Sequence, residues 1–183
     1  MSIFKDHFPR MGSSGVSTGY TIDQSIRFNA ADTAYMKRTP SSGGNQKKWT
    51  FSCWFKRGTT HEANGDQYSH LLGTRTASLA NFFLMDLNSD NIFIQAYTSS
   101  SQTIRVSFTR KLRDPSAWYH FVLRVDTTES LAANRIRVYV NGINQVDNIN
   151  DETYPTLNYD THINGTSLEQ AIGTFTGDNG SND

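Results

Sequence analysis

Hydrolysis of a glycosidic bond requires two carboxyl groups that flank the bond, about 5 Å apart in retaining enzymes and up to roughly 9.5 Å apart in inverting ones. No Glu-x-Asp or Asp-x-x-Glu pair lies inside an expected strand, where two groups one residue apart would share a face. The four glutamates all lie in expected loops or at a strand edge: Glu62, Glu129, Glu152 and Glu169. The carboxylates therefore predict no glycoside hydrolase.

Nucleophilic and cofactor chemistry are equally poorly supported. Cys53 is the only cysteine, and its alternation with aromatic residues is typical of a small buried side chain. His120 lies within a strong strand pattern, which favours a structural role. The sequence contains no Gly-rich phosphate loop, zinc spacing or dinucleotide fingerprint. We therefore expect a protein that is not an enzyme.

Hard oxygen donors of the kind that Ca²⁺ prefers occur in two turn regions. The first region supplies the main candidate ligands, Asp86, Asn88 and Asp90, and the second supplies Asp147, Asn150 and Asp151. Neither region follows an ordered calcium-loop consensus, and Asn/Asp-rich turns also occur without metal. Calcium is thus the single cofactor candidate, and we expect no obligatory one.

Recognition of carbohydrate or protein is the remaining class of function. Glycan sites combine a flat aromatic side chain with amide, guanidinium or carboxylate groups that hydrogen-bond to hydroxyls. The candidate platforms are Trp54, Tyr68 and Tyr97, and the candidate polar contacts are Asn81 and Arg105. The alternative is that these aromatic side chains pack against loops or a neighbouring subunit.

Charge and hydropathy limit the choice of partners. The 183 residues include 17 basic and 17 acidic side chains, so no net charge favours nucleic acid or an anionic membrane. No window approaches the roughly 18 apolar residues of a membrane span. The first ten residues lack the apolar run of a signal peptide, so we expect a protein made in the cytoplasm.

Short runs of β-branched and aromatic residues alternate with turn clusters rich in Gly, Pro, Asn, Asp and Ser. Expected strands are Ser25–Asn29, Ala34–Arg38, Lys48–Arg57, Ser69–Arg75, Asn81–Leu87, Asn91–Tyr97, Thr103–Thr109, Trp118–Asp126 and Arg135–Asn141. The Asn-Gly pair after Tyr139 predicts a tight hairpin with a return strand over Ile143–Asp147. This spacing predicts an all-β, antiparallel sandwich or jelly roll.

Strand alternation indicates which side chains face the core. In "WTFSCWFKR" the inward set is Trp49, Phe51, Cys53 and Phe55. Trp54 then stands on the opposite face, among polar neighbours. In "WYHFVLRVD" both faces carry bulky residues, so we expect this strand to be central and covered on both sides at its beginning.

The domain organisation follows from composition. Residues 1–24 form an arm in which Ile3, Phe4 and Phe8 precede a Gly/Ser-rich tether. Such an arm could anchor the domain on another surface, or its apolar residues could fold back on the domain. Residues 25–173 form the sandwich, and residues 174–183 form a polar tail.

The chain resembles the laminin-G-like, concanavalin A-like lectin domains. The matching stretches occur in the family's order: "SIRFNAADTAYMKR", "WTFSCWFKR" with "LLGTR", "WYHFVLRVDTT" and "RIRVYVNG". The resemblance covers roughly Ile22 to Gly173 and implies a two-sheet sandwich. It also raises calcium and carbohydrate as the expected ligands.

A narrower resemblance is to domains of tailed-bacteriophage structural proteins, carried by residues 20–58 and by "RDPSAWYHFVLRVDTT". It implies a non-enzymatic virion protein, a capsid-surface decoration or tail-fibre component, that binds other virion proteins through the arm. A homo-oligomer and adhesion to host-surface polysaccharide are further expectations. The alternative is a free lectin-like module that belongs to no virion.

One departure from the family concerns the C-terminal end. Related domains continue past the "AIG" strand with a further aromatic strand, whereas here "AIGTFTGDNGSND" runs into a polar tail. Either another chain supplies the closing strand, the fold ends early, or this chain is a shortened form. An unpaired edge would allow another chain to add a strand, and we favour a role in assembly for this end.

Overall fold

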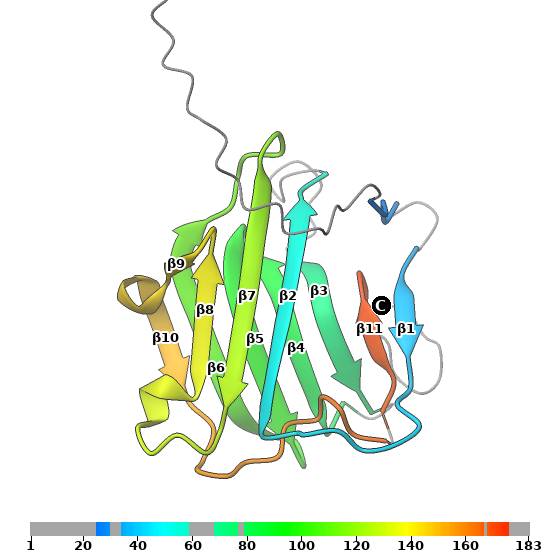
Figure 1. Ribbon diagram of the computed structural model, residues 1–183, viewed down its shortest axis with the longest axis vertical. Coiled ribbons are helices and arrows are strands. Elements are labelled where there is room, and N and C mark those ends of the chain that lie inside the picture. Colours follow the sequence, from blue (N-terminus) through cyan, green and yellow to red (C-terminus); the bar gives the residue numbers. More distant parts are fainter. Residues whose placement is uncertain (1–24, 30–33, 59–67, 77–78, 167, 176–183) are drawn as a thin grey trace, which may run out of the picture.

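The computed structural model describes residues 25–29, 34–58, 68–76, 79–166 and 168–175. These residues form two stacked antiparallel sheets, which confirms the all-β sandwich (Figure 1). One sheet has the strand order β1-β11-β3-β4-β5-β6-β10 and the other β2-β7-β8-β9. The strands are β1 Met36–Arg38, β2 Lys48–Lys56, β3 Tyr68–Arg75, β4 Phe82–Asn88, β5 Asn91–Thr98, β6 Ser101–Lys111, β7 Trp118–Asp126, β8 Ile136–Val140, β9 Ile143–Asn144, β10 Ile149–Thr153 and β11 Gln170–Ile172. Two 3₁₀ turns, Ala132–Asn134 and Val146–Asn148, connect the last strands.

The core lies between the sheets and is filled by alternate residues of each strand, as the sequence pattern predicts. Phe121, Leu123 and Val125 of β7 are fully buried. The inward residues of β2 pack against the same cluster, and the Trp49 ring meets Phe83 edge-on with centroids 5.3 Å apart. Cys53 belongs to this inward set, and burial raises the pKa of its thiol to about 11.

The hairpin at "YVNG" is confirmed. Asn141 and Gly142 have φ values of +51° and +78°, the left-handed conformation that a tight turn between twisted strands requires. The Asn141 N–H donates to the His120 carbonyl oxygen at 2.8 Å, and this bond ties the turn to β7. The return strand β9 is shorter than expected, because a 3₁₀ turn begins at Val146.

Two expectations about strands are wrong. Residues 25–29 form no strand, and the Ile26 side chain is 68% exposed, so its apolar character does not mark a core position. Conversely, β10 carries the polar sequence INDET and was not expected. It pairs only with β6 at the edge of the seven-stranded sheet, where backbone pairing does not require two apolar faces.

The beginning of β7 is not covered on both sides. Tyr119 packs inward, but Trp118 is 51% exposed and His120 is only partly buried. Within the described ranges, the four-stranded sheet packs only on its inner face. The large side chains on the outer face of β7 therefore lie at the surface.

The "AIG" strand is not itself an open edge. β11 pairs with β1 on one side and with β3 on the other, so its backbone groups have partners at both edges (Figure 1). The expected anchor residues Ile3, Phe4 and Phe8 lie outside the described residues. No helix in the described ranges is long and apolar enough to cross a membrane.

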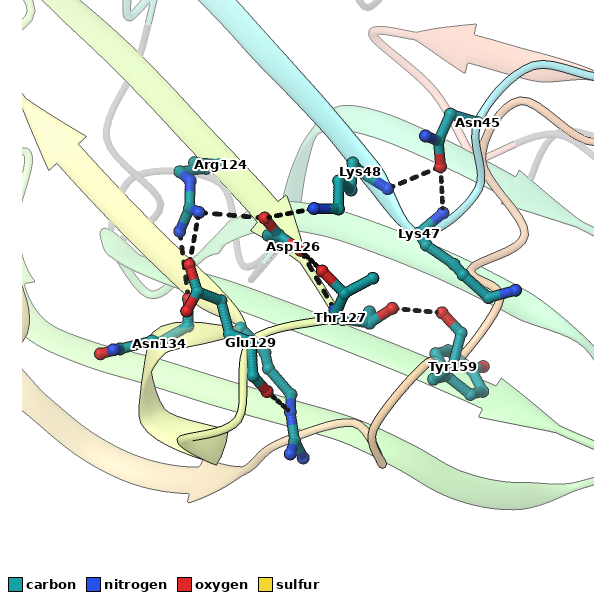
Figure 2. A network of polar contacts seen from close by, with 11 residues as sticks. Asn45, Lys47, Lys48, Arg124, Asp126, Thr127, Glu129, Asn134 and Tyr159 are labelled. Carbon is teal, nitrogen blue, oxygen red and sulfur yellow. Dashed lines mark hydrogen bonds and ion pairs between the residues drawn. The ribbon is translucent and has the colours of Figure 1, made fainter.

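Charged side chains at the end of β7 form a network that holds the β7–β8 connection (Figure 2). Arg124 donates to Asp126 at 3.1 Å and to Glu129 at 2.8 Å, and Lys48 approaches Asp126 at 3.5 Å. The Thr128 hydroxyl donates to Asp126 at 2.7 Å and lowers the pKa of that carboxyl. These acids are bound by their neighbours and serve the fold.

Candidate functional site

The outer face of the four-stranded sheet presents an aromatic surface, which we call the tryptophan face: Trp54, Trp118 and His120. Its members come from two neighbouring strands, because Trp54 of β2 lies directly opposite His120 of β7 and Trp118 lies one same-face position further along. The Trp54 and Trp118 side chains are 57% and 51% exposed. Exposure of large aromatic rings to water is unfavourable, so two such rings on one face indicate a candidate binding surface.

His120 supports the Trp54 ring. The two rings stack with centroids 4.8 Å apart and planes 20° from parallel. Ser52 Oγ lies 3.1 Å from His120 Nε2, and the His120 backbone N–H donates to Asn141 Oδ1 at 2.8 Å. The indole therefore rests on a ring whose position both the strand and the "YVNG" turn fix.

The other four candidate glycan residues lie on or directly beside the seven-stranded sheet, so the structure does not bring them together with Trp54. Tyr68 is 43% exposed and stacks on His70, with centroids 6.3 Å apart. Tyr97 stacks on Phe82 at 4.8 Å and accepts a hydrogen bond from Gln102 at 3.2 Å.

Two of these candidates already have structural partners. Asn81 accepts the Ser99 N–H through Oδ1 at 2.9 Å, which holds the turn before β6. Arg105 forms an ion pair with Asp151 and lies over the Phe93 ring, 5.1 Å from its centroid. Their polar groups are therefore less available to a ligand than the exposed rings of the tryptophan face.

The candidate calcium ligands do not converge on one point. The Asp90 carboxylate is buried between Arg57 and Arg113, and Arg57 also donates to the Leu112 carbonyl oxygen at 2.6 Å. Burial opposes ionisation of Asp90, but the two guanidinium groups outweigh it and lower the pKa. In the part of the chain that the structure describes, no three His, Cys, Asp or Glu side chains gather as a metal group would require.

Addition of a chelator should therefore leave the melting temperature unchanged. Asp90 is paired with two arginines and Asp151 with Arg105, so these two carboxylates are not free to bind Ca²⁺. Among the residues that the structure describes, no other group of three His, Cys, Asp or Glu side chains could hold the ion. Thermal melts with excess EDTA, with excess Ca²⁺ and with neither would measure this. A rise of several degrees in Ca²⁺, reversed by EDTA, would contradict the expectation.

Asp86 is the one candidate whose environment is unusual. It lies in the middle of β4 on the face away from the core, fully buried, and neither carboxyl oxygen has a hydrogen-bond partner. Burial raises its pKa to about 7. The His70 Nδ1 atom lies 3.8 Å from Asp86 Oδ2. A buried carboxyl group without a hydrogen-bond partner destabilises the fold when it ionises.

Sequence reasoning identified Trp54 but not its neighbours on the tryptophan face. Trp118 and His120 were assigned to a covered surface, although they share the parity that places them beside Trp54. The signal available was the antiparallel pairing of the two aromatic strands, which would have put all three rings on one face.

Comparison with known proteins bears on the fold and on the family. The family model described as the Concanavalin A-like lectin/glucanases superfamily matches residues 29–178. Domains LG4–5 of the mouse laminin α1 chain share 8% identity over 78% of this chain, with a TM-score of 0.52. The chain spans only 32% of that laminin structure, and at this identity the likeness shows the fold alone.

Two further solved structures match with lower TM-scores. The LG1–3 region of the laminin α2 chain is 15% identical, with a TM-score of 0.45, over 78% of this chain and 25% of that one. Carbohydrate-binding module CBM66 from Bacillus subtilis is 12% identical, with a TM-score of 0.40, over 76% and 74% of the two chains. No curated protein matches the sequence.

Proposed function

The chain belongs to the concanavalin A-like lectin/glucanase superfamily, and we propose that it is a carbohydrate-binding domain without enzymatic activity. The observation that carries the proposal is the tryptophan face, where Trp54 and Trp118 expose more than half of their side chains on one regular sheet surface. A flat indole matches the apolar C–H face of a sugar ring. Stacking of this kind needs no buried pocket, so it suits an extended polysaccharide.

Binding without hydrolysis is supported by the carboxyl group nearest in sequence to Trp118, that of Asp114. It accepts hydrogen bonds from the Ser116 N–H at 2.8 Å and from the Ser116 hydroxyl at 2.5 Å, and these bonds lower its pKa. A hydrolase needs one carboxyl group to give a proton and a second to act as base or nucleophile. A carboxylate whose pKa is lowered by hydrogen bonds is a poor proton donor.

The direct experiment is an array of bacterial and algal polysaccharides probed with the purified full chain. Retention of at least one polysaccharide, with no release of reducing sugar after prolonged incubation, is the expected result. Release of reducing sugar would overturn the non-enzymatic assignment. Absence of binding to every polysaccharide would overturn the carbohydrate assignment and favour a protein partner for the same face.

We further propose that the domain lies on the surface of a bacteriophage particle, as a capsid decoration or tail-fibre component that adheres to host polysaccharide. The support is the resemblance of residues 20–58 and of "RDPSAWYHFVLRVDTT" to domains of tailed-phage structural proteins. The protein would be made in the host cytoplasm, form a homo-oligomer and bind other virion proteins through residues 1–24.

Purification of intact particles tests this location. The protein should copurify with particles, and deletion of residues 1–24 should remove it from them without abolishing glycan retention. Recovery of the protein only from the soluble fraction, never from particles, would support the alternative of a free lectin-like module.

A further inference from the structure

The two sheets have different widths, and the difference leaves β2 at an edge. The seven-stranded sheet continues through β3, β11 and β1, whereas the four-stranded sheet stops at β2 among the described residues. In Figure 1, β11 and β1 lie to the right of β2, beyond the last strand of the front sheet. Among the described residues, no further strand of the front sheet pairs with β2 on this side.

The backbone of β2 has hydrogen-bonding groups directed at this open side. The Thr127 N–H donates to the Lys47 carbonyl oxygen at 2.9 Å, so the odd-numbered residues of this segment bond to β7. Antiparallel pairing alternates, so the even-numbered residues direct their N–H and C=O groups to the free edge.

Two contacts agree with this assignment: Thr161 donates to the Gln46 carbonyl oxygen at 3.2 Å, and Asn45 accepts the Lys48 N–H at 2.9 Å. Further along β2, the outward backbone groups of Thr50, Ser52 and Trp54 have no partner within the described ranges. A row of three free N–H and C=O groups on a nine-residue strand is a template for strand addition.

A cleft of about 280 Å³ lies beside this edge, between β2 and the β1–β11 pair. Its apolar lining comes from strands of both sheets and includes Met36, Phe51, Leu72, Ile163 and Ile172. Gln170 also lines it, and its amide nitrogen is buried without a hydrogen-bond partner. A strand paired with β2 would direct alternate side chains into this cleft and offer an acceptor to Gln170.

Charge distinguishes between a second copy of the chain and a different partner. β2 begins at Lys48 and ends at Lys56, so antiparallel pairing of two copies about Ser52 would place these lysines opposite one another. Arg38, exposed on β1, adds positive charge to the cleft. An acidic segment gains from the same charges that oppose self-pairing.

We propose that the free edge of β2 accepts an extended segment of another polypeptide, apolar on the face toward the cleft and acidic where it meets Arg38. Backbone bonds to Thr50, Ser52 and Trp54 supply the register, and the cleft selects side chains at every second position. The site uses the edge backbone of β2, whereas the proposed glycan contacts use the indole rings of the tryptophan face.

Selection from a displayed library of random 12-residue peptides tests the proposal with the full chain as bait. Enriched peptides should alternate apolar and polar residues and carry Asp or Glu. Thr50→Pro removes an outward N–H while leaving the β7 ladder intact, and should weaken binding of the enriched peptides at least tenfold. Thr50→Ala, the matched control, should bind within twofold of the parent. Arg38→Glu should weaken the binding of acidic peptides, and Arg38→Gln should weaken it less.

Hydrogen exchange provides a readout that does not depend on a variant folding. The amides of Thr50, Ser52 and Trp54 should exchange rapidly in the free protein and become protected when an enriched peptide is bound. Peptides without alternation, equal binding to both Thr50 variants, or unprotected amides would overturn the proposal. So would a dimer in sedimentation that Thr50→Pro dissociates, because a second copy would then be the occupant.

Discussion

The substitution Trp54→Ala should weaken binding to the best polysaccharide on the array by about 30-fold, or ~2 kcal/mol, the range of a central aromatic contact. The indole is more than half exposed and rests on the His120 ring, so its outer face is free for a sugar. The side chain points away from the core, so the melting temperature should change little. Titration calorimetry on the parent and variant measures the loss.

The matched control is Tyr68→Ala, which removes an exposed aromatic side chain from the other sheet. Its affinity should stay within about twofold of the parent value. A variant at Trp118 should behave like Trp54→Ala, because the two indoles share a face. Loss of binding in Tyr68→Ala with retention in Trp54→Ala would move the glycan site to the seven-stranded sheet.

The substitution Asp86→Asn should make the protein more stable than the parent at pH 8. At pH 4 most of this difference in stability should be absent. Burial raises the pKa of Asp86 to about 7 in the folded protein, from an ordinary value of 3.8. Between these values the folded state holds a proton that the unfolded state has released. The free energy of unfolding of the parent therefore falls as the pH rises through this window, by on the order of 4 kcal/mol in total.

An asparagine has nearly the same shape and does not ionise, so the variant lacks this slope. Urea denaturation at several pH values between 4 and 8 should show the difference in unfolding free energy growing with pH and levelling above about 7. Asp147→Asn, at an exposed carboxylate, is the matched control. A constant difference between Asp86→Asn and the parent would show that the Asp86 carboxyl is solvated or paired in solution.

The strands of the core could be predicted because burial of one face imposes a period of two on their sequences. β7 has the predicted bounds, Trp118–Asp126, since every inward position is apolar. β10 could not be predicted, because an edge strand is held by backbone bonds to β6 and its side chains need no pattern. Residues 25–29 show the converse, since apolar Ile26 there is exposed and the segment forms no strand.

The candidate site could be predicted only one side chain at a time. Alternation places Trp54 on an outer face, but it does not say which of two sheets holds Tyr97 or Tyr68. That assignment depends on pairings between strands far apart in the sequence. The burial of Asp86 could not be predicted either, because an outward position near the end of a strand is exposed unless other parts of the fold cover it.

The partly buried thiol of Cys53 makes the chain convenient for site-specific chemistry. Its pKa of about 11 keeps it protonated at neutral pH, and protonated thiols react slowly with maleimides and iodoacetamides. A single cysteine introduced on an exposed loop would therefore react with a fluorophore or biotin reagent much faster than Cys53. The natural cysteine need not be removed, so the aromatic packing of β2 stays intact while the protein is immobilised or imaged.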